Sequence, residues 1–118
     1  MKPFVVPGNP IAKGRPRVMK GGWTFTPKRT LDHEAKIVSY ALAAKARPMS
    51  GPLEVEIWFW MESRRRVDVD NLAKCVLDAL NGILWDDDDQ VVDLVLHKRY
   101  SKEGPHTHIS CGQAKKFS

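Results

Sequence analysis

Two clusters of acidic residues lie on either side of one short apolar segment. Asp68 and Asp70 follow three consecutive arginines, and four aspartates run from Asp86 to Asp89. If residues 66–70 are extended, Asp68 and Asp70 project from the same side of the chain, because successive side chains alternate. Carboxylates about 4 Å apart repel by roughly 4 kcal/mol at an effective dielectric near 20. A bound cation removes this repulsion, and an all-carboxylate site suits Mg²⁺.

Basic residues are spread around these acidic clusters. The chain has 19 Lys and Arg against 14 Asp and Glu, which gives a net charge of +5 and a pI near 9.4. A basic field around a concentrated acidic spot favours a polyanionic ligand that is bound over a metal. A nucleic-acid backbone is a ligand of this kind.

Alternating apolar residues predict the strands that must position the acids. Residues 53–61 are the clearest case, because five apolar side chains form one face and two Glu and two Trp form the other. The tryptophans imply that the second face is partly covered, by a helix, a subunit partner or stacked bases, and we favour protein. Further strands are expected at residues 3–6, 90–100 and 106–111, with two short strands around the Lys20-Gly21-Gly22 turn.

Two helices are expected between the strands. The first begins at Thr26-Pro27, with threonine as the N-cap and proline at the first helical position, and continues to about residue 46. His33 on this helix is expected at the surface. The second helix follows the first acidic cluster and ends near Asn81-Gly82, where glycine allows a left-handed cap. The expected core-facing residues are Leu31, Ala35, Val38 and Leu42 in the first helix, and Leu72, Val76, Ala79, Leu80 and Ile83 in the second.

The order of these elements predicts an α+β fold. We expect a single domain over residues 1–118, in which two main helices pack against a small mixed or antiparallel sheet. The acidic clusters meet only if the strand that begins at Gln90 lies beside strand 53–61, and we expect antiparallel pairing there. Two cysteines are too few for a disulfide framework, and no signal core or membrane-length apolar segment occurs. These features indicate a reduced, cytoplasmic protein.

Other interpretations compete for the acidic and histidine residues. The first cluster could cap the second helix, and the second cluster could be an exposed turn. An EF-hand is excluded, because the loop from Asp86 has Val91 where the turn glycine belongs and His97 where the bidentate glutamate belongs. His106 and His108 alternate on one strand, but no further zinc ligand is evident and neither cysteine has a Cys-x-x-Cys partner.

Three motifs together resemble one known family. They are Arg-Arg-Arg-Val-Asp-Val-Asp-Asn-Leu-Ala-Lys at residues 64–74, Asp-Ala-Leu-Asn-Gly at 78–82, and Trp-Asp-Asp-Asp-Asp-Gln-Val-Val at 85–92. The combination resembles the RusA-type crossover-junction endodeoxyribonucleases, the Holliday junction resolvases often carried by prophages. Gly-Arg-Pro-Arg at 14–17 is similar to the basic N-terminal motif of that family.

The resemblance implies roles for individual residues. Asp68, Asp70 and Asp88 would be the essential acids, Asp87 would support them, and Lys74 would be a catalytic or phosphate-contacting lysine. It also implies a homodimer that uses Mg²⁺ or Mn²⁺. The chain departs from the family pattern, because four aspartates stand where two precede x-Gln-Val. The register from Gln90 selects Asp87 and Asp88, and Asp86 and Asp89 are the alternatives.

The expected function is therefore metal-dependent cleavage of four-way DNA junctions in recombination and repair. Asp68, Asp70, Asp87 and Asp88 would hold the metal, and Lys74 would orient water or offset charge on the phosphate. Cutting two opposed strands requires two equivalent sites, which a two-fold dimer supplies. The residues expected to contact DNA phosphates are Lys13, Arg15, Arg17, Arg64, Arg65 and Arg66.

Two other functions remain open at this point. One is a nonenzymatic DNA-binding module whose acids are structural. The other is a nuclease with the same chemistry that acts on other branched DNA, such as flaps or forks.

Overall fold

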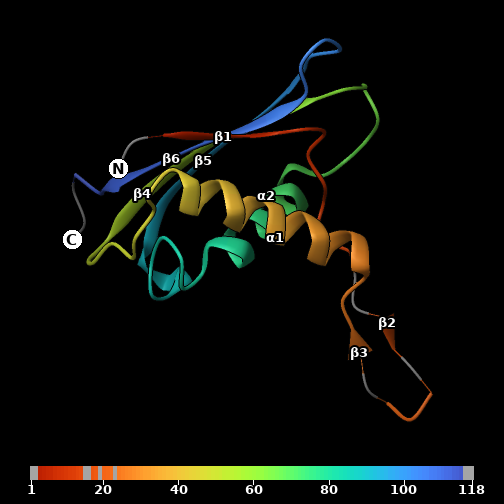
Figure 1. The fold of residues 1–118 in the computed structure, drawn as a ribbon, viewed down its shortest axis with the longest axis horizontal. Coiled ribbons are helices and arrows are strands. Elements are labelled where there is room, and N and C mark those ends of the chain that lie inside the picture. The colour runs from red at the N-terminus through yellow and green to blue at the C-terminus, as the bar shows by residue number, and fades with distance from the viewer. Residues whose placement is uncertain (1–2, 15–16, 19, 23, 116–118) are drawn as a thin grey trace.

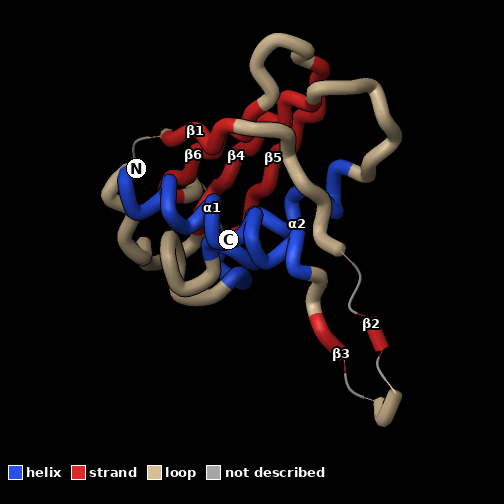
Figure 2. The backbone as a smooth tube through the Cα atoms, turned by 45° about the vertical axis from the view of Figure 1, so that its right-hand side comes forward, coloured by secondary structure: helices blue, strands red, loops and turns tan. Residues whose placement is uncertain are grey.

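A mixed four-stranded sheet forms the centre of the molecule (Figure 1). The computed structural model describes residues 3–14, 17–18, 20–22 and 24–115. The strand order is β1 (Phe4–Pro7), β6 (His106–Gln113), β4 (Leu53–Met61) and β5 (Val91–Tyr100). The predicted short strands are also present, as β2 (Arg17–Val18) and β3 (Thr24–Phe25), in a hairpin that projects from the rest of the molecule (Figure 2).

Two helices, α1 (Lys28–Ala43) and α2 (Val69–Leu80), lie on the same face of the sheet (Figure 2). This arrangement confirms the predicted α+β fold. The prediction of antiparallel pairing for the strand from Gln90 was wrong, because β5 is parallel to β4. The 12 residues of α2 span about 18 Å, which carries the chain back to the start of β4. The next strand therefore runs in the same direction as β4.

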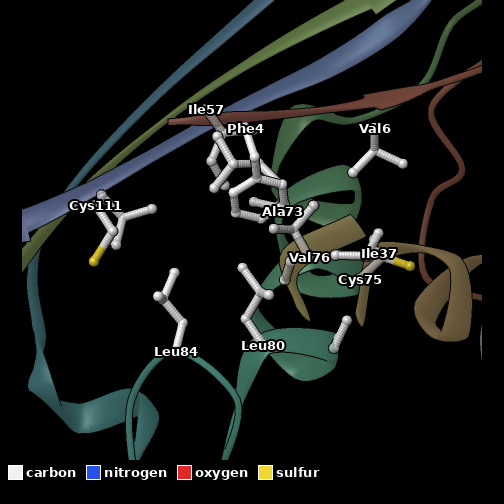
Figure 3. Close-up of a cluster of buried hydrophobic side chains, with 14 of the residues drawn as sticks. Phe4, Val6, Ile37, Ile57, Ala73, Cys75, Val76, Leu80, Leu84 and Cys111 are labelled. Carbon is white, nitrogen blue, oxygen red and sulfur yellow. The ribbon is translucent and has the colours of Figure 1, made fainter. Parts of the chain in front are cut away.

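The core lies between the sheet and the two helices. The apolar face of β4 is buried as predicted, and it meets the apolar face of α2. Figure 3 shows Phe4 and Ile57 from the sheet in one cluster of buried side chains with Ala73, Val76 and Leu80 of α2. Both cysteines are free and buried, and burial raises the pKa of Cys75 to about 12 and that of Cys111 to about 11. These thiols are therefore protonated at neutral pH.

The first helix buries a different face from the one that we predicted. The buried residues are Thr30, His33, Ile37 and Ala41, so the expectation that His33 lies at the surface was wrong. Leu31 and Leu42, which were expected in the core, are 51% and 55% exposed. The buried face carries Ile37 and Ala41, which pack in the apolar core. At its N-terminal end the Thr30 hydroxyl accepts a hydrogen bond of 3.0 Å from the backbone N–H of Gly14.

The second helix ends where the sequence predicted. Its last residue is Leu80, and Gly82 has a φ of 81°, a left-handed conformation that glycine adopts without strain. In the part of the chain that the structure describes, no helix combines the length and the apolar character that a membrane span requires.

Candidate active site

The first acidic cluster forms the beginning of α2. Asp68 is the N-cap residue, with an extended backbone, and Asp70 lies in the first helical turn. The expectation of an extended chain through residue 70 was therefore wrong. The helix rotates by about 100° per residue, so the two carboxylates do not alternate as they would in a strand. Asp68 makes no side-chain capping hydrogen bond, and its exposed side chain does not act as the cap of α2.

The second acidic cluster forms a 3₁₀ turn, η1 (Asp88–Gln90). Asp87 caps this turn, because its carboxylate accepts a hydrogen bond of 3.1 Å from a backbone N–H of η1. The Gln90 side-chain oxygen accepts hydrogen bonds from the backbone N–H groups of Asp86 and Asp87, which precede η1. Its amide nitrogen donates to the carbonyls of Met49 and Gly51, at 2.8 and 3.1 Å. The loop is thereby anchored to the segment before β4.

Asp88 is held in place by a buried tryptophan. The indole N–H of Trp85 donates a hydrogen bond of 2.6 Å to Asp88 Oδ1, and Trp85 is completely buried. The backbone of Trp85 forms β-bridges to Met49 and Asn81, which fix the residue on both sides. No role was predicted for Trp85 from the sequence, although its position directly before the acidic run was a signal.

Asp70, Lys74 and Asp88 line one cavity of about 280 Å³. Asp78 also lines this cavity, whose apolar wall comes from α2 and β5. Asp68 and Asp87 do not line it. Within the described ranges, no three His, Cys, Asp or Glu side chains are grouped closely enough to hold a metal ion by themselves.

The carboxylates at this cavity nevertheless fit a hard divalent cation. Asp70 Oδ1 accepts a hydrogen bond of 3.0 Å from the N–H of Asn71, and Asp88 Oδ1 accepts from Trp85. The other carboxylate oxygen, Oδ2, of Asp70 and of Asp88 takes part in neither of these hydrogen bonds. Mg²⁺ commonly takes only one or two protein carboxylates and keeps several waters. The donor set therefore suits Mg²⁺ or Mn²⁺.

Lys74 belongs to a chain of ion pairs that joins the two helices. Its Nζ lies 3.4 Å from Asp78, which in turn lies 3.1 Å from Lys13 Nζ, and Lys13 also pairs with Glu34 at 2.7 Å. Burial alone would lower the pKa of Lys13. The hydrogen bonds and charges of Glu34 and Asp78 outweigh it, so this pKa lies above 10.5. Because two carboxylates bind its ammonium group, Lys13 has less capacity for a DNA phosphate than we expected.

The predicted arginine triplet lies in the exposed loop that connects β4 to α2. The Arg64 guanidinium lies 4.7 Å from the ring centre of Tyr100. Arg64 and Arg65 line a cavity of about 330 Å³ together with Lys98 and Arg99. Lys98 was not among the predicted basic contacts, although it stands in a basic pair near the end of β5. Arg15 and the side chain of Arg17 lie outside the described residues.

The chain is similar to known proteins over most of its length. Residues 7–111 match the family model described as Endodeoxyribonuclease RusA. The YqaN protein of Bacillus subtilis (strain 168) is 30% identical over 125 residues, which cover 85% of this chain and 88% of that protein. The crossover junction endodeoxyribonuclease RusA of Escherichia coli (strain K12) is 37% identical over 82 residues, which cover 69% of this chain and 62% of that protein. The match thus spans less than two thirds of the Escherichia coli protein.

Proposed function

Because the chain belongs to the RusA family of endodeoxyribonucleases, we propose that it is a metal-dependent endonuclease that cleaves four-way DNA junctions. The observation that carries this proposal is the cavity at which Asp70, Lys74 and Asp88 meet from two separate segments. The name of the Escherichia coli relatives supports the choice of substrate. Action on DNA in recombination and repair would place the protein in the cytoplasm.

Asp70 and Asp88 are the residues that would hold Mg²⁺ or Mn²⁺, with Asp68 close by in sequence at the N-cap of α2. A divalent ion would lower the pKa of a bound water and offset negative charge on the scissile phosphate. Trp85 and Asn71 orient the two carboxylates through their hydrogen bonds. Lys74 supplies a positive charge at the edge of the cavity, where it would stabilise the charge that develops on the phosphate.

The arginines before α2 would bind the flanking DNA backbone. Arg64, Arg65 and Arg66 are exposed and directly precede the acidic cluster, so a strand that they bind would lie next to the cavity. Such contacts position the DNA and carry little sequence information. Two opposed cuts require two cavities, which a homodimer would supply.

The test is cleavage of a synthetic four-way junction with Mg²⁺. Wild type should make paired nicks, and Asp70→Asn should bind the junction but cleave it at least about a hundredfold more slowly. Asp89→Asn is the matched control, because Asp89 is an exposed member of the acidic run that does not line the cavity. Unchanged cleavage by Asp70→Asn would contradict the role of Asp70 as a metal ligand. Loss of cleavage in Asp89→Asn would indicate that Asp89 is a metal ligand of the run from Asp86 to Asp89.

The same assay separates the two rival functions. A DNA-binding module would bind the junction without Mg²⁺ and would not nick it with any metal. A nuclease for other branched DNA would cleave flaps or forks faster than four-way junctions. Both substrates therefore belong in the panel, beside a linear duplex.

A further inference from the structure

One side of α2 carries three charged residues that face the candidate active site. Asp70, Lys74 and Asp78 follow one another at intervals of four residues, which places them on successive turns of the same side of the helix. All three line the same cavity. Lys74 therefore has one carboxylate within reach on the turn before it and another on the turn after it.

Lys74 pairs with the carboxylate on the later turn. Its Nζ lies 3.4 Å from Asp78 Oδ2 and 3.5 Å from Asp78 Oδ1. Within the described ranges Lys74 forms no ion pair with Asp70. An isolated helix favours the opposite choice, because an acid that precedes a lysine by four residues pairs better than one that follows it. The tertiary structure must therefore stabilise the pair with Asp78.

Lys13 holds Asp78 in the position that this pair requires. Its Nζ lies 3.1 Å from Asp78 Oδ2 and 2.7 Å from a carboxylate oxygen of Glu34 in α1. The side chains of Lys13 and Glu34 are only 17% and 16% exposed, whereas that of Lys74 is 62% exposed. Because Asp78 is already fixed on the inner side, its pair with Lys74 requires the ordering of one side chain rather than two.

The choice of partner matters for the cavity, a step that rests on the proposed function. Asp70 is one of the carboxylates that would hold the metal. An ammonium group bound to Asp70 would compete with a divalent cation for the same oxygens. It would also be drawn away from the phosphate whose charge it should offset. With Lys74 bound to Asp78, Asp70 stays available to the ion.

We propose that Asp78 is a positioning residue, which keeps Lys74 away from Asp70 and at the edge of the cavity. Asp78 binds Lys74 directly, and Lys13 fixes Asp78 from the side of α1. Asp78 is not a metal ligand in this arrangement, because two ammonium groups already bind its carboxylate. When that carboxylate is removed, Lys74 pairs with Asp70, the other acid on the same side of the helix.

The first test reads the position of Lys74 in the protein without metal or DNA. The measurement is ¹³C NMR of the aspartate side-chain carboxyl groups at neutral pH. Asp78→Asn should move the signal of Asp70, because Lys74 then pairs with it. In a Lys74→Gln background, Asp78→Asn should leave the Asp70 signal in place. Asp32→Asn, which removes an exposed carboxylate from α1, is the control and should not move it.

The second test is single-turnover cleavage of a four-way junction by the same variants. Asp78→Asn should lower the rate at saturating Mg²⁺ by about three- to tenfold, and Asp78→Glu should regain most of it. In a Lys74→Gln background, Asp78→Asn should cause no further loss, because its effect acts through Lys74. A merely structural role of Asp78 would slow cleavage by the same factor in both backgrounds, and this result would overturn the proposal.

The two tests separate this proposal from the proposed function. An Asp70 signal that does not respond to Asp78→Asn, or that responds equally without Lys74, would refute the positioning role even if wild type cleaves junctions. The expected NMR pattern in a protein that cleaves no DNA with any metal would refute the proposed function and keep the placement of Lys74 by Asp78.

Discussion

Trp85 shows how one buried side chain can position a candidate metal ligand. Trp85 is completely buried, and its indole N–H donates a hydrogen bond to Asp88 Oδ1. The ring anchors the bond on the core side, and the carboxylate faces the cavity. We therefore assign Trp85 as a positioning residue for Asp88.

Trp85→Phe should keep most of the apolar packing and remove the hydrogen bond. We expect junction cleavage to fall by about 10- to 100-fold and the Mg²⁺ concentration for half-maximal cleavage to rise. The free energy of unfolding should fall by about 1–2 kcal/mol. Leu84→Val, a change at a neighbouring buried residue, is the control for stability loss alone. An unchanged Mg²⁺ requirement in Trp85→Phe would show that Trp85 is only structural.

His33 makes stability depend on pH. Burial lowers the pKa of its imidazole to about 4, and the positive charges of Lys36 and Arg29 add to this effect. The unfolded chain, with a pKa of 6.5, binds a proton that the folded chain does not bind between pH 6.5 and 4. The stability that neutral His33 contributes is therefore present above pH 6.5 and is lost as the pH falls towards 4.

His33→Gln should flatten this part of the pH profile. Urea denaturation at intervals between pH 7 and pH 4 measures it, and the difference in unfolding free energy between wild type and variant should change across that window. His97→Gln is the comparison, because His97 pairs with Glu56 on the opposite face of the sheet. If wild type and His33→Gln have parallel profiles, His33 does not titrate as described.

At the scale of the elements, Lys13 connects α1 to α2. Its ammonium group pairs with Glu34 of α1 and Asp78 of α2, and its backbone N–H donates to the carbonyl of Asn71 at 3.0 Å. Because Asp78 also pairs with Lys74, this connection extends to the cavity that Asp70 and Asp88 line.

Lys13→Met should leave two partly buried carboxylates with one partner fewer. We expect a loss of about 1–3 kcal/mol in the free energy of unfolding, measured with urea at neutral pH. Lys28→Met at the exposed start of α1 is the control and should change stability by less than about 0.5 kcal/mol. Equal effects of the two changes would show that the partly buried ion pairs of Lys13 contribute nothing specific to stability.

The acidic loop depends on Gln90 in two ways. Its side-chain oxygen accepts hydrogen bonds from the backbone N–H groups just before η1. Its side-chain nitrogen donates to the carbonyls of Met49 and Gly51. Gln90→Glu retains the acceptor and removes the donor, whereas Gln90→Ala removes both. We expect faster hydrogen exchange at the N–H groups of residues 86–89 in both variants, and more so in Gln90→Ala. Equal exchange in wild type and both variants would exclude this anchoring role.

At the scale of the whole molecule, the charge distribution predicts how DNA is bound. The basic loop before α2 and the acidic cavity lie next to each other, so phosphate binding and metal binding should be separable. Junction affinity should fall linearly with salt on a double-logarithmic plot, and Arg65→Ala should reduce the slope by about 1. Lys45→Ala, beyond the end of α1, should not change the slope. An unchanged slope for Arg65→Ala would remove Arg65 from the DNA interface.

The elements of the fold were largely predictable because their signals are local. Alternation predicted β4 and its buried face, and Gly82 predicted the end of α2. The acidic and basic motifs also indicated the family, which the comparisons confirm. These signals depend on neighbours within a few residues along the chain.

The tertiary structure decided what depends on contacts between distant residues. It made β5 parallel to β4, turned Thr30 and His33 rather than Leu31 towards the core, and placed Trp85 behind Asp88. It also bound Lys13 between two helices and left the tryptophans of β4 on an open face. Periodicity shows that a face is apolar, but the partner of that face is fixed only when segments such as Gln90 and Met49, 41 residues apart, pack together.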